Sequence, residues 1–357
     1  MPQQKLDFSV GAFAVIGLFV GVSAAAFAYT GGWLTPDRLT PARMVNALSM
    51  RGGDPLGHRR NHAKGVCFTG IFAANGAGAR LSTAAMLAAG QYTVIGRFAI
   101  ATGNPDAPDS AGRVRSMAIR IVAPDGEEWR SGMNNSPVFV VATPEAFYDL
   151  TLAQDLDPAT GEPNPVAMER FNAAHPESAP FNEWAETAPW TTSYADQTYQ
   201  SLNAFHFVDS GGGDHLVRWS MQPTVAPQVM PTAQLASLPP DFLAHDLKRR
   251  LASGELSWRL VVILAQPGDP SNDATKAWPA DREHVDVGVL VIRHAEDEAD
   301  GPCRDYNYDP TILPNGVRAS DDPLLAARSA AYARSFDLRA SEAADYPRTA
   351  PRPASKP

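Results

Sequence analysis

Between residues 66 and 292, apolar and polar side chains repeatedly alternate with a period of two, the pattern of strands buried on one face. Residues 210–214 (SGGGD) predict a hairpin turn between two of these strands. About eight antiparallel strands with inserted helices predict an α+β fold, built on a closed or nearly closed barrel able to enclose a ligand. The expected strands are 66–73, 92–101, 114–123, 137–142, 204–209, 216–221, 258–265 and 285–292.

Helical patterns lie before, between and after the strands. Beyond residue 300 no strand pattern remains, and a leucine- and alanine-rich segment predicts a final helix that begins after a Ser-Asp-Asp cluster at 320–322. Pro323 would occupy its first turn. The other expected helices are 41–50, 82–89, 144–153, 165–174 and 240–252.

Residues 8–29 contain no charged side chain over 22 positions, which is enough helix to cross a hydrocarbon layer. Ala26-Phe27-Ala28 also has the form of a signal-peptidase site, so an uncleaved anchor and a removed signal compete. A buried core helix is a third reading. The length of the apolar run favours the anchor. We expect a bacterial inner-membrane protein with its main domain in the periplasm, or a soluble periplasmic protein if the signal is cleaved.

Four regions are expected: a signal-anchor segment at 1–29, a linker with a short helix at 30–50, one large domain at 51–340, and a solvated proline-rich tail at 341–357. The net charge of −9 and the absence of a basic run argue against a nucleic-acid partner. Cys67 and Cys303 could pair in an oxidising compartment, but we expect both to be small apolar residues.

Arg328 and Tyr332 are the residues of the last helix that carry chemistry. Residues four apart share a helical face, so the guanidinium would lie beside the phenol oxygen. A nearby positive charge favours the phenolate, which is a good ligand for ferric iron. Alternatively, the pair is an arginine on a surface helix and a tyrosine on its apolar face.

The string from Tyr308 to Ser320 runs into this helix, and together they resemble the proximal haem segment of catalases. In that family a tyrosinate is the axial iron ligand. The resemblance implies haem b as cofactor, Tyr332 as the metal ligand and Arg328 as the residue that keeps the phenolate charged.

His62 stands in Arg59-Arg60-Asn61-His62-Ala63-Lys64-Gly65, which resembles the distal-histidine segment of catalases. By itself, a histidine at a strand entrance is more often a hydrogen-bonded structural residue. The resemblance makes His62 a catalytic acid-base, a role that suits imidazole because its pKa is near neutral.

The segment 132–139 (GMNNSPVF) is similar to the Gly-x-Asn-Thr-Pro segment of catalases, although Met133 alters the spacing. The match implies that Asn134 donates a hydrogen bond to bound peroxide while Asn135 is structural. Without it, the segment would be a turn before a strand. By the same match, Phe147 would line the distal pocket, and Met117 is expected in the core.

Haem carries two propionates, and arginine binds carboxylates with paired donors. Arg59, Arg97 and Arg339 match the propionate-binding arginines of the family. Individually, each would be read as an ordinary surface arginine.

Three residues depart from the family pattern. Ala99 replaces a serine that can bond the distal imidazole, Asn203 replaces a histidine on the proximal side, and Asn61 replaces an apolar residue at the channel mouth. Residues that hydrogen-bond to a reacting side chain strongly affect its orientation and reactivity, so from these three replacements we expect weak catalase activity.

The resemblance covers residues 51–340 and follows the pattern of short catalase-related peroxidases. It implies reduction of organic hydroperoxides or hydrogen peroxide by an external electron donor. The alternatives are a hydroperoxide isomerase of the allene oxide synthase type, a non-enzymatic haem carrier or sensor, and a lipid-binding barrel. The sequence leaves the oligomeric state open between a monomer and a homodimer.

Overall fold

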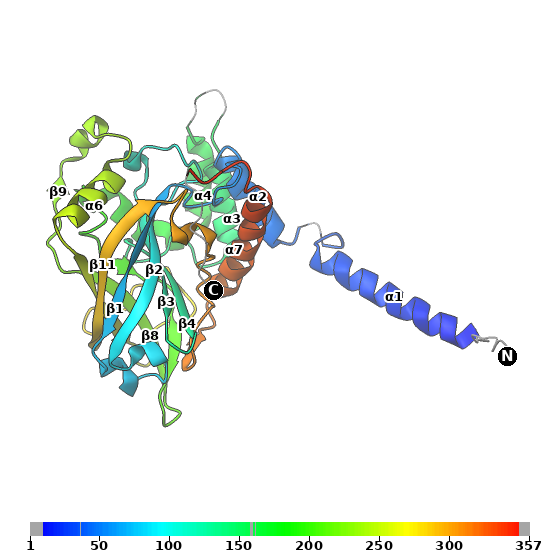
Figure 1. Ribbon diagram of the computed structural model, residues 1–357. Helices are drawn as coiled ribbons and strands as arrows, with labels where there is room; N and C mark the ends of the chain where they lie inside the picture. Colours follow the sequence, from blue (N-terminus) through cyan, green and yellow to red (C-terminus); the bar gives the residue numbers. More distant parts are fainter. Residues whose placement is uncertain (1–9, 36, 158–159, 161, 350–357) are drawn as a thin grey trace.

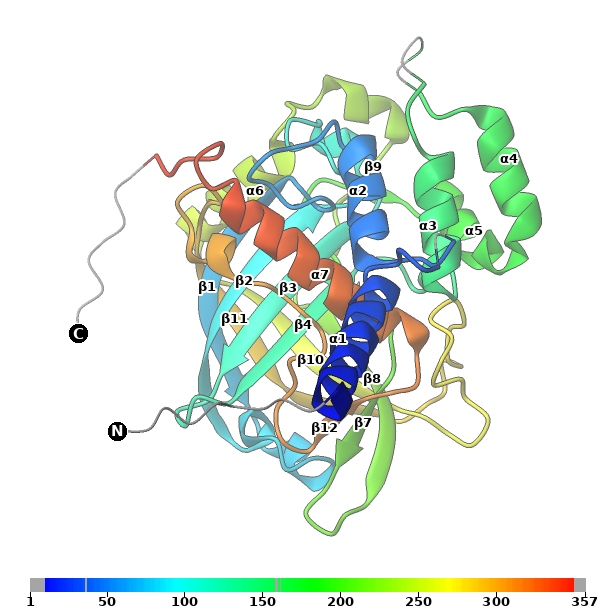
Figure 2. The ribbon, with the colours of Figure 1, turned by 90° about the vertical axis from the view of Figure 1, so that its right-hand side faces the viewer.

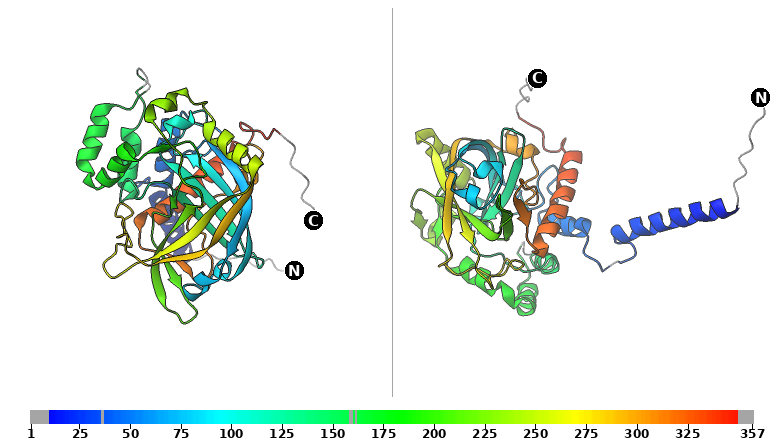
Figure 3. Two further views of the ribbon diagram at one scale, coloured as in Figure 1. Left: turned by 90° about the vertical axis from the view of Figure 1, so that its left-hand side faces the viewer. Right: turned by 90° about the horizontal axis from the view of Figure 1, so that it is seen from below.

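The computed structural model describes residues 10–35, 37–157, 160 and 162–349. A β-barrel forms the body, and most of the helices cover one side of it (Figure 1). Helix α1 (Val10–Thr30) extends away from this body in Figure 1 and in the right-hand view of Figure 3.

Eight antiparallel strands close into a ring, because β10 pairs with both β11 and β8. The predicted closed barrel is therefore confirmed. The short strands β7 (Phe205–Val208) and β12 (Val317–Ala319) extend the sheet beyond β8, and β5 (Trp190–Thr191) pairs with β9 (Val229–Met230) separately. The order around the ring is β10 (Leu256–Leu264), β11 (His284–Asp297), β1 (Gly65–Ala74), β2 (Gly90–Ile100), β3 (Arg115–Val122), β4 (Glu128–Asn134), β6 (Tyr199–Gln200) and β8 (Asp214–Pro223).

Aromatic side chains fill the inside of the barrel. Trp129 and Trp219 meet edge to face with ring centroids 5.0 Å apart, and Phe98 stacks on Tyr194 at 5.0 Å. An eight-stranded barrel is just wide enough for side chains to fill it. The expectation that the barrel itself encloses a ligand is therefore wrong, and the space for a ligand lies outside its wall. The largest inward side chains are Phe68, Phe72, Phe98, Trp129, Tyr199, Phe205, Phe207, Trp219 and Trp258.

Three helices cover the outer face of the barrel: α2 (Pro41–Arg51), α3 (Pro144–Ala153) and α7 (Pro323–Ser341). Each begins with a capping side chain followed by proline, and the caps Thr40, Thr143 and Asp322 accept hydrogen bonds from the backbone of the first turn. Figure 2 shows α7 crossing outside β3 and β4, with α2 and α3 beside it.

The remaining helices lie farther from this face. Helix α4 (Pro165–Ala174) packs against α3, and α6 (Phe242–Ser253) packs against β11 on the other side of the barrel. The shorter elements are α5 (Ala179–Thr187), η1 (Ala77–Arg80), η2 (Ala85–Leu87), η3 (Asp109–Ala111), η4 (Pro176–Ser178), η5 (Thr232–Ser237) and η6 (Pro302–Asp305).

Several sequence predictions for local structure were wrong. Residues 137–142 form no strand, because the fourth long strand, β4, ends at Asn134 and the apolar run beyond it packs under α3. Residues 82–89 contain only the short η2, and β12 lies beyond residue 300. A short apolar run is equally compatible with a strand or with buried irregular chain.

Cys67 and Cys303 form a disulfide, so the expectation of two free apolar cysteines was wrong. The bond joins β1 to η6 across 236 residues of sequence, and both side chains are fully buried. The carbonyl of Cys303 accepts a hydrogen bond from Arg59 at 3.0 Å. The disulfide therefore fastens the segment after β11 against the barrel. Disulfide bonds of this kind form and persist mainly in oxidising compartments.

Residues 11–30 of α1 are long and apolar enough to cross a membrane, and none of that span is buried in the described structure. A signal sequence near an N-terminus has the same properties. Farther along, residues 342–349 contact the body rather than extend into solvent. Tyr346 stacks on His58 at 3.9 Å, and Arg348 pairs with Asp305 at 2.5 Å. Residues 350–357 of the expected tail lie outside the described residues.

Replacement of both cysteines by alanine should lower the free energy of unfolding by about 2–5 kcal/mol, because the disulfide restricts the unfolded chain. Urea unfolding of the oxidised wild type and of the double variant measures the difference. Titration of two free thiols in unfolded, unreduced wild-type protein would contradict the pairing.

Candidate active site

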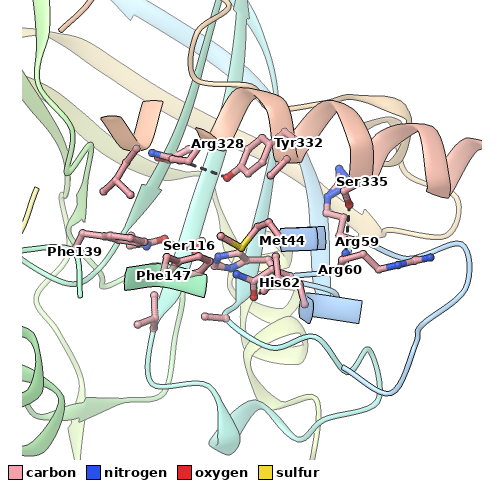
Figure 4. A pocket seen from close by; sticks show the side chains of 18 of the residues that line it. Met44, Arg59, Arg60, His62, Ser116, Phe139, Phe147, Arg328, Tyr332 and Ser335 are labelled. Atoms are coloured by element: carbon pink, nitrogen blue, oxygen red, sulfur yellow. Dashed lines mark hydrogen bonds between the residues drawn. The ribbon is translucent and has the colours of Figure 1, made fainter. Parts of the chain in front are cut away.

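A cavity of about 680 Å³ lies between the outer face of β2–β4 and helices α2, α3 and α7 (Figure 4). Its size suits a small molecule or a cofactor. Strand alternation sets its barrel-side wall: Ile119 and Ile121 of β3 point into the barrel core, whereas Ser116 and Ala118 line the cavity. Met117 is fully buried in the core, as predicted, and also reaches the cavity wall.

His62 lies in the loop before β1 with a φ of 54°, a left-handed conformation that non-glycine residues rarely adopt. Its backbone is fixed on both sides. The His62 N–H donates to Oδ1 of Asn61 at 3.0 Å, and its carbonyl accepts from Arg97 at 2.7 Å. Such a conformation persists only where the surroundings enforce it. Here it directs the imidazole into the cavity.

Ser116 fixes the tautomer of His62. Its Oγ lies 3.0 Å from Nδ1 of His62 and 2.7 Å from Oδ1 of Asn134. The amide oxygen can only accept, so the single hydroxyl hydrogen goes to Asn134, and Oγ accepts from Nδ1–H of the histidine. The neutral imidazole therefore carries its proton on Nδ1, and Nε2 is left as a proton acceptor.

Because Ala99 replaces a serine, we expected no hydroxyl beside the imidazole of His62. Ser116, on the neighbouring strand β3, supplies one. Ala99 of β2 pairs directly with Ser116 of β3, and Ser116 pairs with Asn134 of β4. The three residues form one row across three strands. A serine moved by one strand along this row still reaches Nδ1 of the imidazole.

His62 is held in its neutral form. Burial, reinforced by the positive charges of Arg97, Arg328, Arg51 and Arg59, lowers its pKa from 6.5 to about 3. A neutral imidazole with a bare Nε2 is the form required of a general base.

The two asparagines, Asn134 and Asn135, differ in their surroundings. Asn134 lines the cavity, and because its Oδ1 accepts from Ser116, its amide N–H₂ is available as a donor. Asn135 instead bonds to the backbone N–H of Arg115 at 2.9 Å and to Gln197 at 2.9 Å. Its side chain is thereby fixed to the barrel wall.

Tyr332 and Arg328 belong to α7 and line the side of the cavity opposite His62. The Arg328 guanidinium lies 3.5 Å from the Tyr332 phenol oxygen (Figure 4). Arg328 also donates to the carbonyl of Gly132 at 3.2 Å and to Asn203. Asn203 in turn donates to Asp322 at 2.7 Å. Asn203, which replaces the histidine expected from the family pattern, therefore connects Arg328 to Asp322, the N-cap of α7.

Arg59, Arg97 and Arg339 all line the cavity, and Glu298 is their shared carboxylate. Arg97 pairs with it at 2.6 Å and Arg59 at 3.6 Å. Burial opposes ionisation of Glu298, but the charges of Arg97 and Arg59 outweigh burial and lower its pKa to about 2. Burial also lowers the pKa of Arg339 to about 8.

The charges at this end of the cavity do not balance, because three guanidinium groups face one carboxylate. The buried Nε atoms of Arg97 and Arg339 have no hydrogen-bond partner. Gly65 is needed here, because a Cβ at this position would lie 2.5 Å from Cζ of Arg97. Buried charges are normally paired, so this end fits a ligand with more than one carboxylate.

Phe147 and Asn61 also line the cavity. Phe147 of α3 packs against Phe139, with ring centroids 5.6 Å apart. Asn61 accepts from Arg51 at 3.3 Å. Sequence reasoning missed Ser116, Glu298 and Arg51. Of these, only Ser116 could have been found from the sequence, because it is a serine in the predicted strand 114–123, which follows the predicted strand that contains Ala99.

Residues 39–346 match the sequence pattern of the catalase family. The chain belongs to the catalase family. It is 34% identical over 328 residues to a protein named catalase-related peroxidase from Synechococcus elongatus, covering 92% of this chain and 95% of that one. It is 31% identical to a protein of the same name from Mycolicibacterium paratuberculosis, covering 84% and 95%.

A solved bacterial catalase shares the fold, with a TM-score of 0.72 and 22% identity, covering 90% of this chain and 64% of that one. Among the described residues no group of three His, Cys, Asp or Glu side chains could hold a metal ion. The cavity nevertheless suits the haem that catalases generally bind, because a porphyrin brings its own four nitrogen ligands and two carboxylates. The protein then needs to supply one axial ligand and a cationic end.

Ser116→Ala should lower turnover of peroxide about 10- to 100-fold while leaving the fold intact, because Nδ1 of His62 loses its partner. The double variant Ala99→Ser/Ser116→Ala returns a hydroxyl to the same row and should recover most of the loss. Steady-state kinetics with hydrogen peroxide compares the three proteins. An unimpaired Ser116→Ala variant would contradict the positioning role.

The pH dependence of kcat/KM should be flat between pH 8 and 5, because His62 stays neutral until the pH approaches its lowered pKa of about 3. A histidine with an ordinary pKa would lose about 30-fold over that range as it became protonated. Rate measurements with hydrogen peroxide in buffers of constant ionic strength distinguish the two. A tenfold fall by about pH 5.5 would contradict a neutral, buried base.

Proposed function

We propose that this protein is a haem b-dependent peroxidase that reduces organic hydroperoxides or hydrogen peroxide with an external electron donor, and has weak catalase activity. The supporting observation is that Tyr332 with Arg328 on one side of the cavity faces His62 with Ser116 and Asn134 on the other. The names of the two related peroxidases agree with this function.

Tyr332 would hold the haem iron through its phenol oxygen, with Arg328 stabilising the negative charge on that oxygen. Arg59, Arg97 and Arg339 would bind the propionates, whose two charges match the excess of guanidinium groups. Phe147 would pack against the distal side. A bound haem would supply the iron that accepts oxygen from the peroxide and delivers oxidising equivalents to the donor.

The chain's own part in the reaction is proton transfer and orientation. Nε2 of His62 would accept the proton from one peroxide oxygen and return it to the departing oxygen as the O–O bond breaks. Nδ1–H stays bonded to Ser116 throughout. The amide N–H₂ of Asn134 donates to the peroxide and fixes its direction. A proton shuttle of this kind typically contributes about 100- to 10,000-fold.

A periplasmic location on the inner membrane fits two features of the chain. Helix α1 is long and apolar enough for an anchor. The buried Cys67–Cys303 disulfide fits an oxidising compartment. Cell fractionation, with protease treatment of spheroplasts, tests this: the domain should be membrane-bound and digested from outside.

The purified, haem-loaded protein should convert cumene hydroperoxide to the alcohol only when a reducing dye is present, with one equivalent of a two-electron dye oxidised per alcohol. Product analysis by chromatography measures this. An epoxide or ketol formed from a fatty-acid hydroperoxide without a donor would indicate an isomerase instead. Reversible haem transfer without any turnover would indicate a carrier.

Tyr332→Phe should lose most of its haem, because no other described side chain on α7 offers an anionic ligand at this point of the cavity. Haem content per chain, measured as the pyridine haemochrome, is the test. Tyr306→Phe is the matched control, since it removes another phenol hydroxyl from the same cavity and should leave haem content unchanged. Wild-type haem content and spectrum in Tyr332→Phe would refute the axial assignment.

A further inference from the structure

One face of α2 changes from apolar to cationic along the cavity wall. Met44, Leu48 and Arg51 recur at helical spacing, and all three line the cavity together with Val45. Met44 and Leu48 are buried, and Arg51 is the last residue of the helix. With a rise of 1.5 Å per residue, the stripe from Met44 to Arg51 is about 10 Å long.

Helix α3 presents a second stripe of the same kind. Phe147 and Leu150 line the cavity, and Gln154, directly after the helix, also lines it. Nη1 of Arg51 donates to Oε1 of Gln154 at 2.7 Å, so the polar ends of the two stripes meet. Neighbouring helices α2 and α3 therefore form two walls that both run from apolar side chains to a polar end.

The apolar end of the cavity extends beyond these two helices. Met168 and Phe171 of α4 and Phe181 of α5 line the same cavity and pack in one cluster with Leu150. The cation near this cluster is Arg113, which also lines the cavity and lies 5.4 Å over the ring of Trp184 in α5. None of the residues assigned to peroxide or to the propionates belongs to the cluster. It suits a flexible hydrocarbon chain, whose burial is favourable in proportion to its apolar area.

Arg51 has no acidic partner among the described residues. Its hydrogen bonds go to the neutral amides of Gln154 and Asn61, at 2.7 and 3.3 Å. A guanidinium has five N–H donors, so these two bonds leave others to bind a carboxylate. Burial lowers the pKa of Arg51, and a partly buried cation is stabilised by a counter-ion.

Arg51 is also distinct from the arginines at the other end. Arg97 and Arg59 form ion pairs with Glu298, whereas no such pair involves Arg51 among the described residues. The positive charges of Arg97, Arg51 and Arg59 all help to lower the pKa of His62. Asn61, which bonds Arg51, is the residue before His62. Met44 at the apolar end of the stripe lies on the same side of the cavity as His62 in Figure 4. A chain laid along α2 would thus pass close to the imidazole.

We propose that the peroxide substrate is a long-chain hydroperoxy carboxylic acid, whose carboxylate pairs with Arg51 and whose hydrocarbon chain lies along the stripes of α2 and α3. This assignment rests on the proposed peroxidase function and adds its substrate class. In the reaction, the O–O bond of the hydroperoxide breaks, a reduced organic donor gives up two electrons and two protons, and the products are the hydroxy acid and water.

The test compares linoleic acid hydroperoxide with its methyl ester, using the haem-loaded full-length protein and a reducing dye. The wild type should favour the acid in kcat/KM by about 10- to 100-fold, the range of a hydrogen bond to a charged group. Arg51→Gln should bring the acid-to-ester ratio close to one, and Arg51→Lys should give an intermediate ratio. A wild-type ratio of one, or an unchanged ratio in Arg51→Gln, would overturn the proposal.

Arg334→Gln is the matched control, because Arg334 is an exposed arginine on α7 outside the cavity and the charge change is the same. It should keep the wild-type acid-to-ester ratio. A ratio lowered as far as in Arg51→Gln would show a general charge effect and overturn the local site.

Binding of the unreactive hydroxy acid and its ester, measured by equilibrium dialysis, separates this proposal from the function. Acid-selective binding that depends on Arg51, without turnover of any peroxide, would support the carboxylate site and contradict the peroxidase. Turnover of hydrogen peroxide and cumene hydroperoxide, without acid selectivity in either assay, would contradict only the substrate class.

Discussion

The aromatic filling of the barrel determines where this protein can bind anything. Because rings such as Trp129, Trp219 and Trp258 occupy the interior, the strands offer a ligand only their outward side chains. The period of two then sorts each strand into core residues and cavity residues. Helices α2, α3 and α7 cover that outer face and leave a space between themselves and the wall. The proposed catalytic residues come from both sides of this space.

Within that space, the imidazole of His62 is positioned by hydrogen bonds that start from strands β3 and β4 of the barrel wall. Ser116 lies between His62 and Asn134, directly opposite Ala99 on the adjacent strand. The barrel wall can therefore supply a hydroxyl to Nδ1 from either of two strands, because paired positions lie about 5 Å apart and face the same way. This explains how a chain that lacks the expected serine retains the bond.

Positive charge is the second organising element of the cavity. Arginines near His62 disfavour the imidazolium, and the cluster around Glu298 leaves room for added carboxylates. Burial is the larger cause of the lowered pKa of His62, and the guanidinium groups add to it, because the same positive charges that repel a proton attract an anion. The same arginines could therefore keep the proposed acid-base group, His62, neutral and bind the two carboxylates of the proposed haem.

Much of this arrangement could be predicted because its determinants are local in sequence. The helix of Tyr332 and Arg328 follows from its cap and composition, and the long strands follow from their period. What could not be predicted depends on pairing. The match of Ala99 to Ser116 requires the register of β2 on β3, and the Cys67–Cys303 bond requires knowing that η6 returns to β1. The position of the cavity outside the barrel depends on ring packing that no single segment reveals.

The central claim is that Tyr332 and His62 face each other across a haem. The most direct measurement is the haem stoichiometry of the purified full-length protein, together with resonance Raman spectroscopy of its iron ligands. The account predicts one haem b per chain and the vibrations of a tyrosinate bound to ferric iron. A folded protein that takes up no haem, or one whose iron lacks a phenolate ligand, would contradict it.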